Sequence, residues 1–198
     1  MAIIVDKVQK RKEIALSCKE LFVQNSMSTI TSSLIAKTAG VGKGTIYEYF
    51  KNKEEIVFEI ATVLMQEHAQ KLEVDLSKQK STKEKVRKFS EFFYSEEEFE
   101  LRAIYKDFIS ISLAAPQEDM LAFHTECFHN YYSWFESILK EGVESGELKK
   151  ETLGLSRGLF VTAEGMFVSS CVTNSVDSLE KELNSYIDNM FELLEAKA

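Results

Sequence analysis

Residues 31–50 read TSSLIAKTAGVGKGTIYEYF, and this stretch decides the fold of the N-terminal part of the chain. Thr31 belongs to the residue types that cap helix N-termini, so a short helix is expected over residues 32–39. Gly40 takes a positive φ at little cost, which predicts a turn after that helix. A second short helix then runs over about residues 44–50. Two short helices joined by a glycine-centred turn are typical of a helix-turn-helix.

The second short helix opens with side chains that suit a polyanion. Lys43 supplies a positive charge, Gly44 lets another molecule approach the backbone, and Thr45 supplies a hydroxyl. Two tyrosines and two lysines follow at Tyr47, Tyr49, Lys51 and Lys53. Hydroxyls and ammonium groups of this kind contact the phosphates and base edges of DNA.

The composition predicts an all-α protein. The 198 residues include 1 Pro and 8 Gly, too few for the many tight turns of a sheet protein of this length. Capping residues and apolar spacing predict about nine helices. The expected ranges are 7–25, 32–39, 44–50, from 53 onward, 82–94, 96–114, 116–144, 152–173 and 178–196.

Charge is distributed unevenly along the chain. Residues 1–53 contain nine Lys or Arg and four Asp or Glu, a balance of +5. Because the whole chain carries −8, residues 54–198 carry −13. A basic end joined to an acidic body favours a polyanion as the partner of the basic end. We therefore expect a DNA-binding domain over residues 1–53 and a second domain over residues 54–198.

The sequence argues against membrane, disulfide, cofactor and metal classes. The uncharged stretch over residues 165–176 is shorter than a membrane span, and the apolar residues 2–5 are followed directly by Asp6. The 3 cysteines fit neither a disulfide framework nor a metal site. We expect a cytoplasmic protein without a cofactor, and no arrangement of residues typical of an enzyme is present.

The stretch GVGKGTIYEYFKNKEEI, residues 40–56, strongly resembles the DNA-binding signature of the TetR/AcrR family of bacterial transcriptional regulators. Ile14, Leu21 and Phe22 resemble the family's first helix, and the resemblance covers about residues 8–68. It implies an all-helical homodimer that binds a near-palindromic operator in double-stranded DNA, usually as a repressor. It also implies that a small molecule in the body releases the DNA.

The resemblance also implies roles for single residues. The residues that match DNA contacts of the family, or lie beside them, are Thr31, Ser32, Ser33, Lys43, Gly44, Thr45, Tyr47, Glu48, Tyr49 and Lys53. Three positions depart from the family pattern. Ser26 replaces a usual Gly, and Gly42 replaces a capping Ser or Thr. Glu48 either accepts a hydrogen bond from a cytosine or faces solvent.

Aromatic residues crowd the acidic body, and as a group they could line an apolar cavity. Each one taken alone is more simply a core residue. The proposed effector contacts are Phe89, Phe93, Arg102, Tyr105, Phe108, His124, Phe128, Tyr131, Trp134 and Phe167. We expect a hydrophobic or aromatic effector. A regulator without a small-molecule effector, controlled by a protein partner or by abundance, is the alternative.

A metal-dependent enzyme is the more remote alternative. Glu126 and His129 form a Glu-x-x-His pair of the kind found in di-iron bundles. Such sites need a second pair on a facing helix. His68 and His124 follow Met65 and Leu121 instead of a glutamate, so no second pair exists and no metal is expected.

The last two helices are expected to form a dimer interface. Gly154, Gly158 and Thr162 recur every four residues, which permits close helix approach. The last helix has a broad apolar face. In the TetR/AcrR family the corresponding helices form a four-helix bundle between subunits. The residues expected at the interface are Gly158, Thr162, Leu183, Ile187, Met190 and Leu194.

Overall fold

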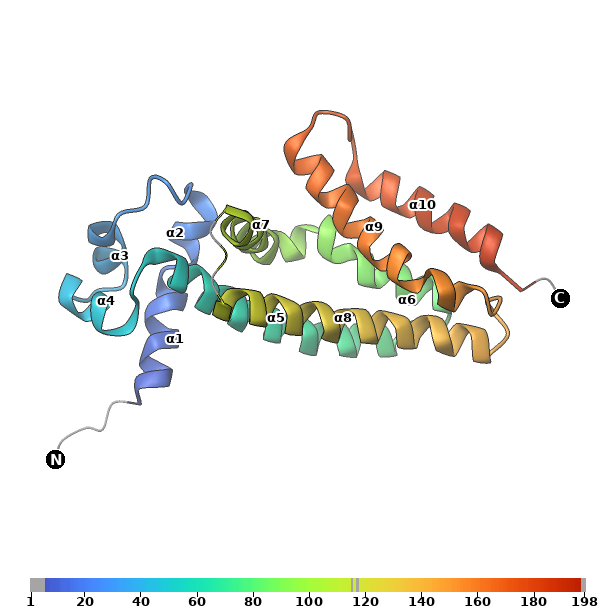
Figure 1. Ribbon diagram of the computed structural model, residues 1–198, viewed down its shortest axis with the longest axis horizontal. Helices are drawn as coiled ribbons and strands as arrows, with labels where there is room; N and C mark the ends of the chain where they lie inside the picture. The colour runs from blue at the N-terminus through green and yellow to red at the C-terminus, as the bar shows by residue number, and fades with distance from the viewer. Residues whose placement is uncertain (1–5, 115, 117, 197–198) are drawn as a thin grey trace. The chain divides into compact units, whose positions relative to one another are not determined.

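The computed structural model describes residues 6–114, 116 and 118–196. The described residues form ten α-helices and two 3₁₀ turns, which confirms the all-α prediction (Figure 1). The helices are α1 Lys7–Ser17, α2 Lys19–Gln24, α3 Ser32–Thr38, α4 Lys43–Tyr49, α5 Lys53–Ser77, α6 Thr82–Ser90, α7 Phe99–Ala114, α8 Glu118–Glu144, α9 Thr152–Val172 and α10 Leu179–Leu194. The 3₁₀ turns are η1 Glu91–Phe93 and η2 Glu96–Glu98.

The chain divides into two compact units. The first comprises Met1–Ala69 and Glu100–Leu121, and the second comprises Gln70–Phe99 and Ala122–Ala198. This division differs from the expected boundary after residue 53. Helix α5 carries the buried side chains Ile56 and Ile60 in its first part, so its start belongs to the first unit.

The first expected helix is broken at Cys18. The amide of Cys18 donates to the carbonyl of Ala15 at 3.0 Å, a tighter spacing than the α-helix uses. The hydroxyl of Ser17 donates back to the carbonyl of Ile14 at 2.7 Å, a bond that bends helices. Helix α2 follows this break and buries Phe22 in the core of the first unit.

The helix-turn-helix has the predicted cap and turn. The Thr31 hydroxyl accepts a hydrogen bond from the amide of Leu34 at 3.3 Å and begins α3. Gly40 has φ +66°, the left-handed value that favours glycine. Ile35 and Ala36 of α3 and Ile46 of α4 are buried, so the two helices pack on one core (Figure 1).

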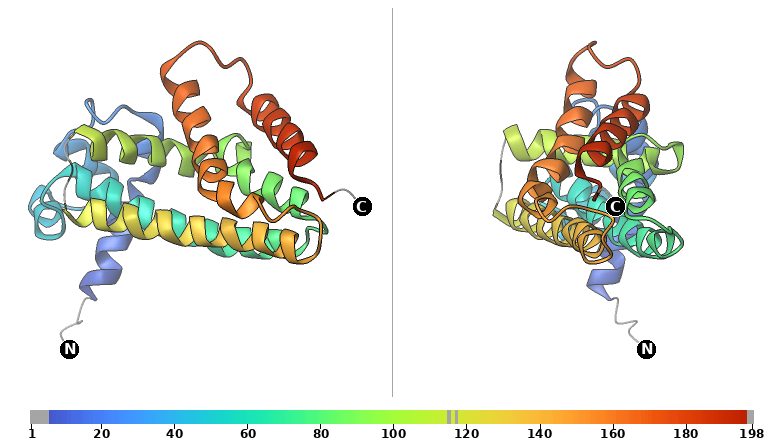
Figure 2. Two further views of the ribbon diagram at one scale, coloured as in Figure 1. Left: turned by 45° about the vertical axis from the view of Figure 1, so that its right-hand side comes forward. Right: turned by 90° about the vertical axis from the view of Figure 1, so that its right-hand side faces the viewer.

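The second unit contains the end of α5, helices α6, α9 and α10, and the part of α8 that follows Leu121. The predicted capping box at Ser81 and Glu84 is present at the start of α6. Gly146 follows α8 with φ +79°, as its predicted role in ending that helix requires. Helix α8 begins at Glu118, two residues after Pro116. Helices α9 and α10 lie side by side, joined by residues 173–178 (Figure 2).

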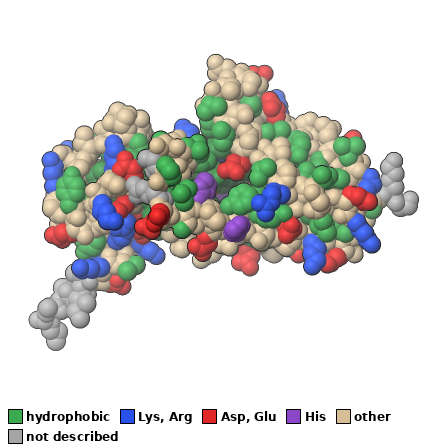
Figure 3. Space-filling view, in the orientation of Figure 1, with side chains coloured by type: hydrophobic (Ala, Val, Ile, Leu, Met, Phe, Trp, Pro, Cys, Tyr) green, Lys and Arg blue, Asp and Glu red, His purple; other side chains and the backbone are tan. Residues whose placement is uncertain are grey.

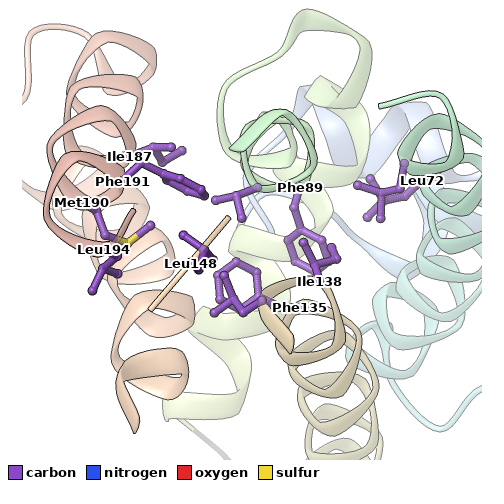
Figure 4. Packing of buried hydrophobic residues seen from close by; sticks show 12 residues of the cluster. Leu72, Phe89, Phe135, Ile138, Leu148, Ile187, Met190, Phe191 and Leu194 are labelled. Atoms are coloured by element: carbon purple, nitrogen blue, oxygen red, sulfur yellow. The ribbon is translucent and has the colours of Figure 1, made fainter. Parts of the chain in front are cut away.

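Apolar side chains from five segments form the core of the second unit (Figure 4). Phe89 of α6 lies among ring neighbours of α8, with Phe135 at 5.5 Å between ring centroids. The face of α10 reaches the same core through its buried apolar side chains. The buried members of this core cluster are Leu72, Leu76, Val86, Phe89, Phe135, Ile138, Leu139, Leu148, Ile187, Met190, Phe191 and Leu194.

Neither a membrane-spanning helix nor a metal-binding cluster is found in the described part of the chain. No helix there is long and apolar enough to cross a membrane. No group of three or more His, Cys, Asp or Glu side chains in the same residues could hold a metal ion. The apolar residues 2–5 lie outside the described residues.

Candidate nucleic-acid interface

Helix α4 presents a polar face to the surroundings. Ile46 and the following Phe50 are buried at 3% and 1% exposure, which orients the rest of the helix. Lys43, Gly44 and Glu48 are exposed, and Tyr47 is 59% exposed. These residues share one face because they recur at helical spacing. The major groove of DNA admits an α-helix, so a short helix with an exposed polar face can reach the base edges there.

A hydrogen bond joins the exposed sides of α3 and α4. The hydroxyls of Ser32 and Tyr47 are 2.9 Å apart. Thr31 and Ser33 lie beside Ser32 and are exposed. The structure therefore brings the expected contacts at the start of α3 close to Tyr47 of α4, and paired hydroxyls can donate to one phosphate.

Positive charge is available on both helices. Among the described residues, Lys37 of α3 and Lys43 of α4 form no ion pair, and both are exposed. Lys51 is 87% exposed and lies 3.7 Å from Glu55. Figure 3 shows Lys and Arg side chains on the part of the surface that holds α1–α4. Cations without partners in the protein are suited to phosphate contact.

Two expected contacts on α4 are less accessible than its exposed face. Thr45 and Tyr49 are half-buried. Gly42 caps α4 without a side-chain hydrogen bond, as the missing hydroxyl predicts. Glu48 is exposed, which leaves both of its expected roles open.

Lys53 has partners inside the protein. Its ammonium donates to the carbonyls of Met27 and Ile30, the latter at 3.3 Å, and so holds the loop before α3. An ammonium has three N–H donors, so at most one remains for phosphate. Lys53 therefore also fixes this loop, and its expected contact with a phosphate stays a prediction.

Sequence reasoning missed Arg11 of α1. Its guanidinium donates to the carbonyl of Tyr49 and to Glu59 Oε2, the latter at 2.8 Å, and lies 4.2 Å from the centroid of the Phe50 ring. Glu55 lies one helical turn before Glu59 on α5. The one signal in the sequence was this pair of acids at i and i+4, which offers a cation two carboxylates on one face.

The expected effector contacts do not all belong to one unit. Arg102, Tyr105 and Phe108 lie on α7 in the first unit, where the Phe108 ring stacks on Phe58 at 6.3 Å. The seven others belong to the second unit. The structure therefore assigns the ten residues to two groups, which a sequence list could not separate.

The aromatic residues of the second unit include both core and partly exposed members. Phe89 meets Tyr131 and Trp134 edge-on at 6.1 and 6.0 Å, a contact of core type. Phe93 and Phe167 are 5.6 Å apart. The rings named here form two groups, one around Phe89 and one made of Phe93 and Phe167.

Polar groups along the inner side of α8 are partly removed from water. Burial lowers the pKa of His124, against the opposing effect of the Glu164 charge. Burial raises the pKa of the Cys127 thiol to about 11 and also raises that of Tyr131. Neutral polar groups beside aromatic rings are the usual lining of a ligand site.

The expected dimer contacts on α10 need correction. Leu183, Ile187, Met190 and Leu194 are between 1% and 8% exposed, and the last three belong to the core cluster of their own unit. They have almost no surface to offer a second chain. The apolar face of α10 is real, but this chain covers it.

Helix α9 has an exposed face that the sequence reasoning only partly recognised. We call it the α9 stripe, and it comprises Gly154, Gly158, Val161, Gly165, Val168 and Val172. The spacing alternates between four and three residues, which is the signal that could have identified it. Val172 is 74% exposed, and a Cβ added at any of the three glycines would meet nothing within 4 Å. Thr162 lies beside it, half-buried, with its hydroxyl bonded to the Gly158 carbonyl at 2.7 Å.

Comparisons with known proteins agree with this geometry. Residues 18–60 match the family described as bacterial regulatory proteins, tetR family. An uncharacterized HTH-type transcriptional regulator, YhgD of Bacillus subtilis, is 30% identical over 144 residues, which is 72% of this chain and 73% of that protein.

Two solved structures share the fold. A putative transcriptional regulator from Saccharomonospora viridis in complex with choline has a TM-score of 0.80 at 12% identity, over 96% of this chain and 100% of that one. The regulator FadR from Bacillus subtilis in complex with stearoyl-CoA has a TM-score of 0.62 at 26% identity, over 90% of this chain and 96% of that one. With its exposed helix-turn-helix and these relatives, the chain belongs to the TetR family of transcriptional regulators.

Proposed function

We propose that this regulator is a homodimeric repressor that binds a palindromic operator and leaves it when a hydrophobic ligand occupies the second unit. The observation that carries the proposal is the exposed face of α4, where Lys43, Gly44 and Tyr47 are free of the core. On this account α4 enters the major groove. The hydroxyls of Ser32 and Tyr47, together with Lys37 and Lys43, hold the DNA backbone.

The dimer is inferred from the α9 stripe. A glycine inside a helix costs about 1 kcal/mol relative to alanine, and Gly154, Gly158 and Gly165 repeat this cost on one face. Their own chain does not need the space, since a Cβ at each would meet nothing. The three valines of the stripe give the face an apolar character. A second copy of α9 packed closely on this stripe accounts for both features.

A palindromic site follows from this arrangement. A two-fold dimer presents its two α4 helices in opposite directions, so each reads the same sequence on opposite strands. Helix-turn-helix dimers of this kind bind half-sites one helical turn, about 34 Å, or a multiple of it apart.

The ligand is proposed to lie along α8 and α9 of the second unit. The half-buried His124, Cys127 and Tyr131 provide polar contacts, and Phe93 and Phe167 provide apolar walls. FadR, the relative solved with stearoyl-CoA, makes long-chain acyl thioesters the first class to test. Release requires only that the ligand bind the DNA-free state more tightly, by about 1–3 kcal/mol in typical cases.

The test selects duplexes from a randomised pool with the wild-type protein and with the double variant Lys43→Ala/Tyr47→Phe. We expect a palindrome that the variant no longer selects. Stearoyl-CoA, with free coenzyme A as the matched control, is then added to the complex of wild type and selected duplex. Release by stearoyl-CoA alone supports the ligand class. A complex that resists all apolar ligands favours regulation without an effector, consistent with the dense ring packing around Phe89.

A further inference from the structure

Arg11 lies where α1, the end of α4 and the start of α5 meet in the first unit. On one side its guanidinium donates to the carbonyl of Tyr49, the last residue of α4, and stacks over the Phe50 ring at 4.2 Å. On the other side Nε lies 2.8 Å from Glu59 Oε2, and Nη1 lies 3.7 Å from Glu55 Oε2. One side chain therefore ties the end of α4 to two other helices.

The chemistry of these contacts requires an arginine. The side chains of Arg11, Glu55 and Glu59 are 29%, 18% and 14% exposed, so their attraction is screened less than that of a surface pair. The planar guanidinium donates in several fixed directions and stacks on a ring at the same time. A lysine ammonium at this position would keep the charge but could not make this set of contacts together.

Packing holds the C-terminal end of α4 through few side chains, chiefly Ile46 and the following Phe50. A crevice of about 350 Å³ lies beside it, with Tyr47, Tyr49, Phe58 and Met120 among its walls. Among the described residues of α4 itself, Ile46 alone has a buried side chain. A helix of 7 residues has little stability of its own and depends on such tertiary contacts. The contacts of Arg11 therefore add to the buried Phe50 ring in fixing this end of the helix.

We propose that Arg11 is a positioning residue for DNA recognition, which sets the angle of α4 without touching DNA. The inference rests on the proposed function, because it assumes that α4 reads the operator. Base contacts require side chains to be held within about 0.5 Å of their productive positions, whereas contacts to phosphate tolerate more movement. Loss of Arg11 should therefore weaken specific binding more than non-specific binding.

The test compares Arg11→Met with Lys10→Met. Lys10 is the matched control because it carries the same charge on the same helix and pairs only locally with Glu13, at 3.2 Å. Dissociation constants are measured for the selected duplex and for an unrelated duplex at several salt concentrations. We expect Arg11→Met to lose about tenfold or more on the selected duplex and much less on the unrelated one. The slope of log affinity against log salt should equal that of wild type.

Two further variants separate positioning from charge. Arg11→Lys keeps the charge and should still lose specificity, in the same direction as Arg11→Met. Glu59→Gln should weaken specific binding in the wild-type background but add little to Arg11→Met, because both changes break the same tie. Fully additive losses would contradict the proposal.

Amide hydrogen exchange supplies a readout that needs no DNA. The amide of Phe50 donates to the carbonyl of Ile46 at 2.9 Å, and its exchange reports the end of α4. We expect faster exchange in Arg11→Met and wild-type exchange in Lys10→Met, with core amides at Ile14 and Ile60 still protected in both. Unfolding of the whole first unit would expose all of these amides together.

Two results would overturn the proposal. Equal losses on both duplexes, with a salt slope flatter by about one, would make Arg11 a direct phosphate contact. Unchanged exchange at the end of α4 in Arg11→Met would show that Arg11 positions nothing. If wild type selects no duplex, the proposed function fails instead, while the exchange comparison still decides the role of Arg11 in holding α4.

Discussion

Gly158→Ala tests the dimer, because an isolated chain and a dimer predict changes in stability of opposite sign. In an isolated chain, the added methyl would meet nothing within 4 Å. The change would then stabilise α9 through helix propensity alone, by about 1 kcal/mol. For a chain of this length, that gain raises the melting temperature by about 2–4 °C.

In the proposed dimer, the same methyl enters a close contact between two α9 helices. Overpacking costs about 1–3 kcal/mol for each added group, and the two-fold axis introduces two groups at once. The cost therefore exceeds the propensity gain. We expect the dissociation constant of the dimer to rise at least about tenfold, which corresponds to 1.4 kcal/mol.

The assay combines sedimentation equilibrium with thermal unfolding over a range of protein concentrations. The dimer account predicts a lower melting temperature for Gly158→Ala at micromolar concentration and a stronger dependence on concentration. Gly44→Ala is the control, since Gly44 is a helical glycine with open space around it in the first unit. A Gly158→Ala protein that melts higher at every concentration and sediments like wild type would refute the reasoning.

Three other predictions concern single side chains. Thr31→Ala removes the cap of α3 and should lower the free energy of unfolding by about 1 kcal/mol in urea titrations, whereas Ser33→Ala should not. Lys53→Met removes the half-buried ammonium that holds the loop before α3, and should cost about 1.5–3 kcal/mol in the same assay; a cost near zero would show that the carbonyl contacts are not formed. Burial lowers the pKa of His124 below 6.5, its ordinary value, so near that pH the unfolded chain binds a proton more readily than the folded chain does. The free energy of unfolding therefore falls as the pH drops through about 6.5. His124→Asn should therefore lose less stability between about pH 7 and about pH 5 than wild type does. An equal loss in both proteins would remove His124 as the cause, and His129→Asn is the matched change on the exposed side of α8.

The parts of the fold that local chemistry controls could be predicted from the sequence. The Thr31 cap, the positive φ of Gly40 and the capping box at Ser81 all appear as expected, because each depends on residues within one turn. The break at Cys18 was not foreseen. It depends on back-bonding by Ser17 and on a contact of the Cys18 thiol with the Ile35 carbonyl, which a one-dimensional pattern does not contain.

The sequence predicted which helices have an apolar face, but not which part of the protein packs against each face. Periodicity identified the apolar side of α10 but not its partner, and the structure shows that its own unit covers Ile187 and Met190. The same limit applies to Lys53: the sequence shows its charge but does not show the backbone carbonyls to which its ammonium donates. Arg11 was missed because its contacts come from two other helices, α4 and α5. Tertiary partners decide the role of such residues, and sequence spacing reports only the element on which they lie.

The number of chains that bind one selected duplex tests the central claim most directly. Native mass spectrometry of wild type with that duplex should show two chains per duplex. A duplex that carries only one half-site should bind much more weakly. A single chain that occupies the full site with equal affinity for the half-site would contradict a dimer that reads a palindrome through α4.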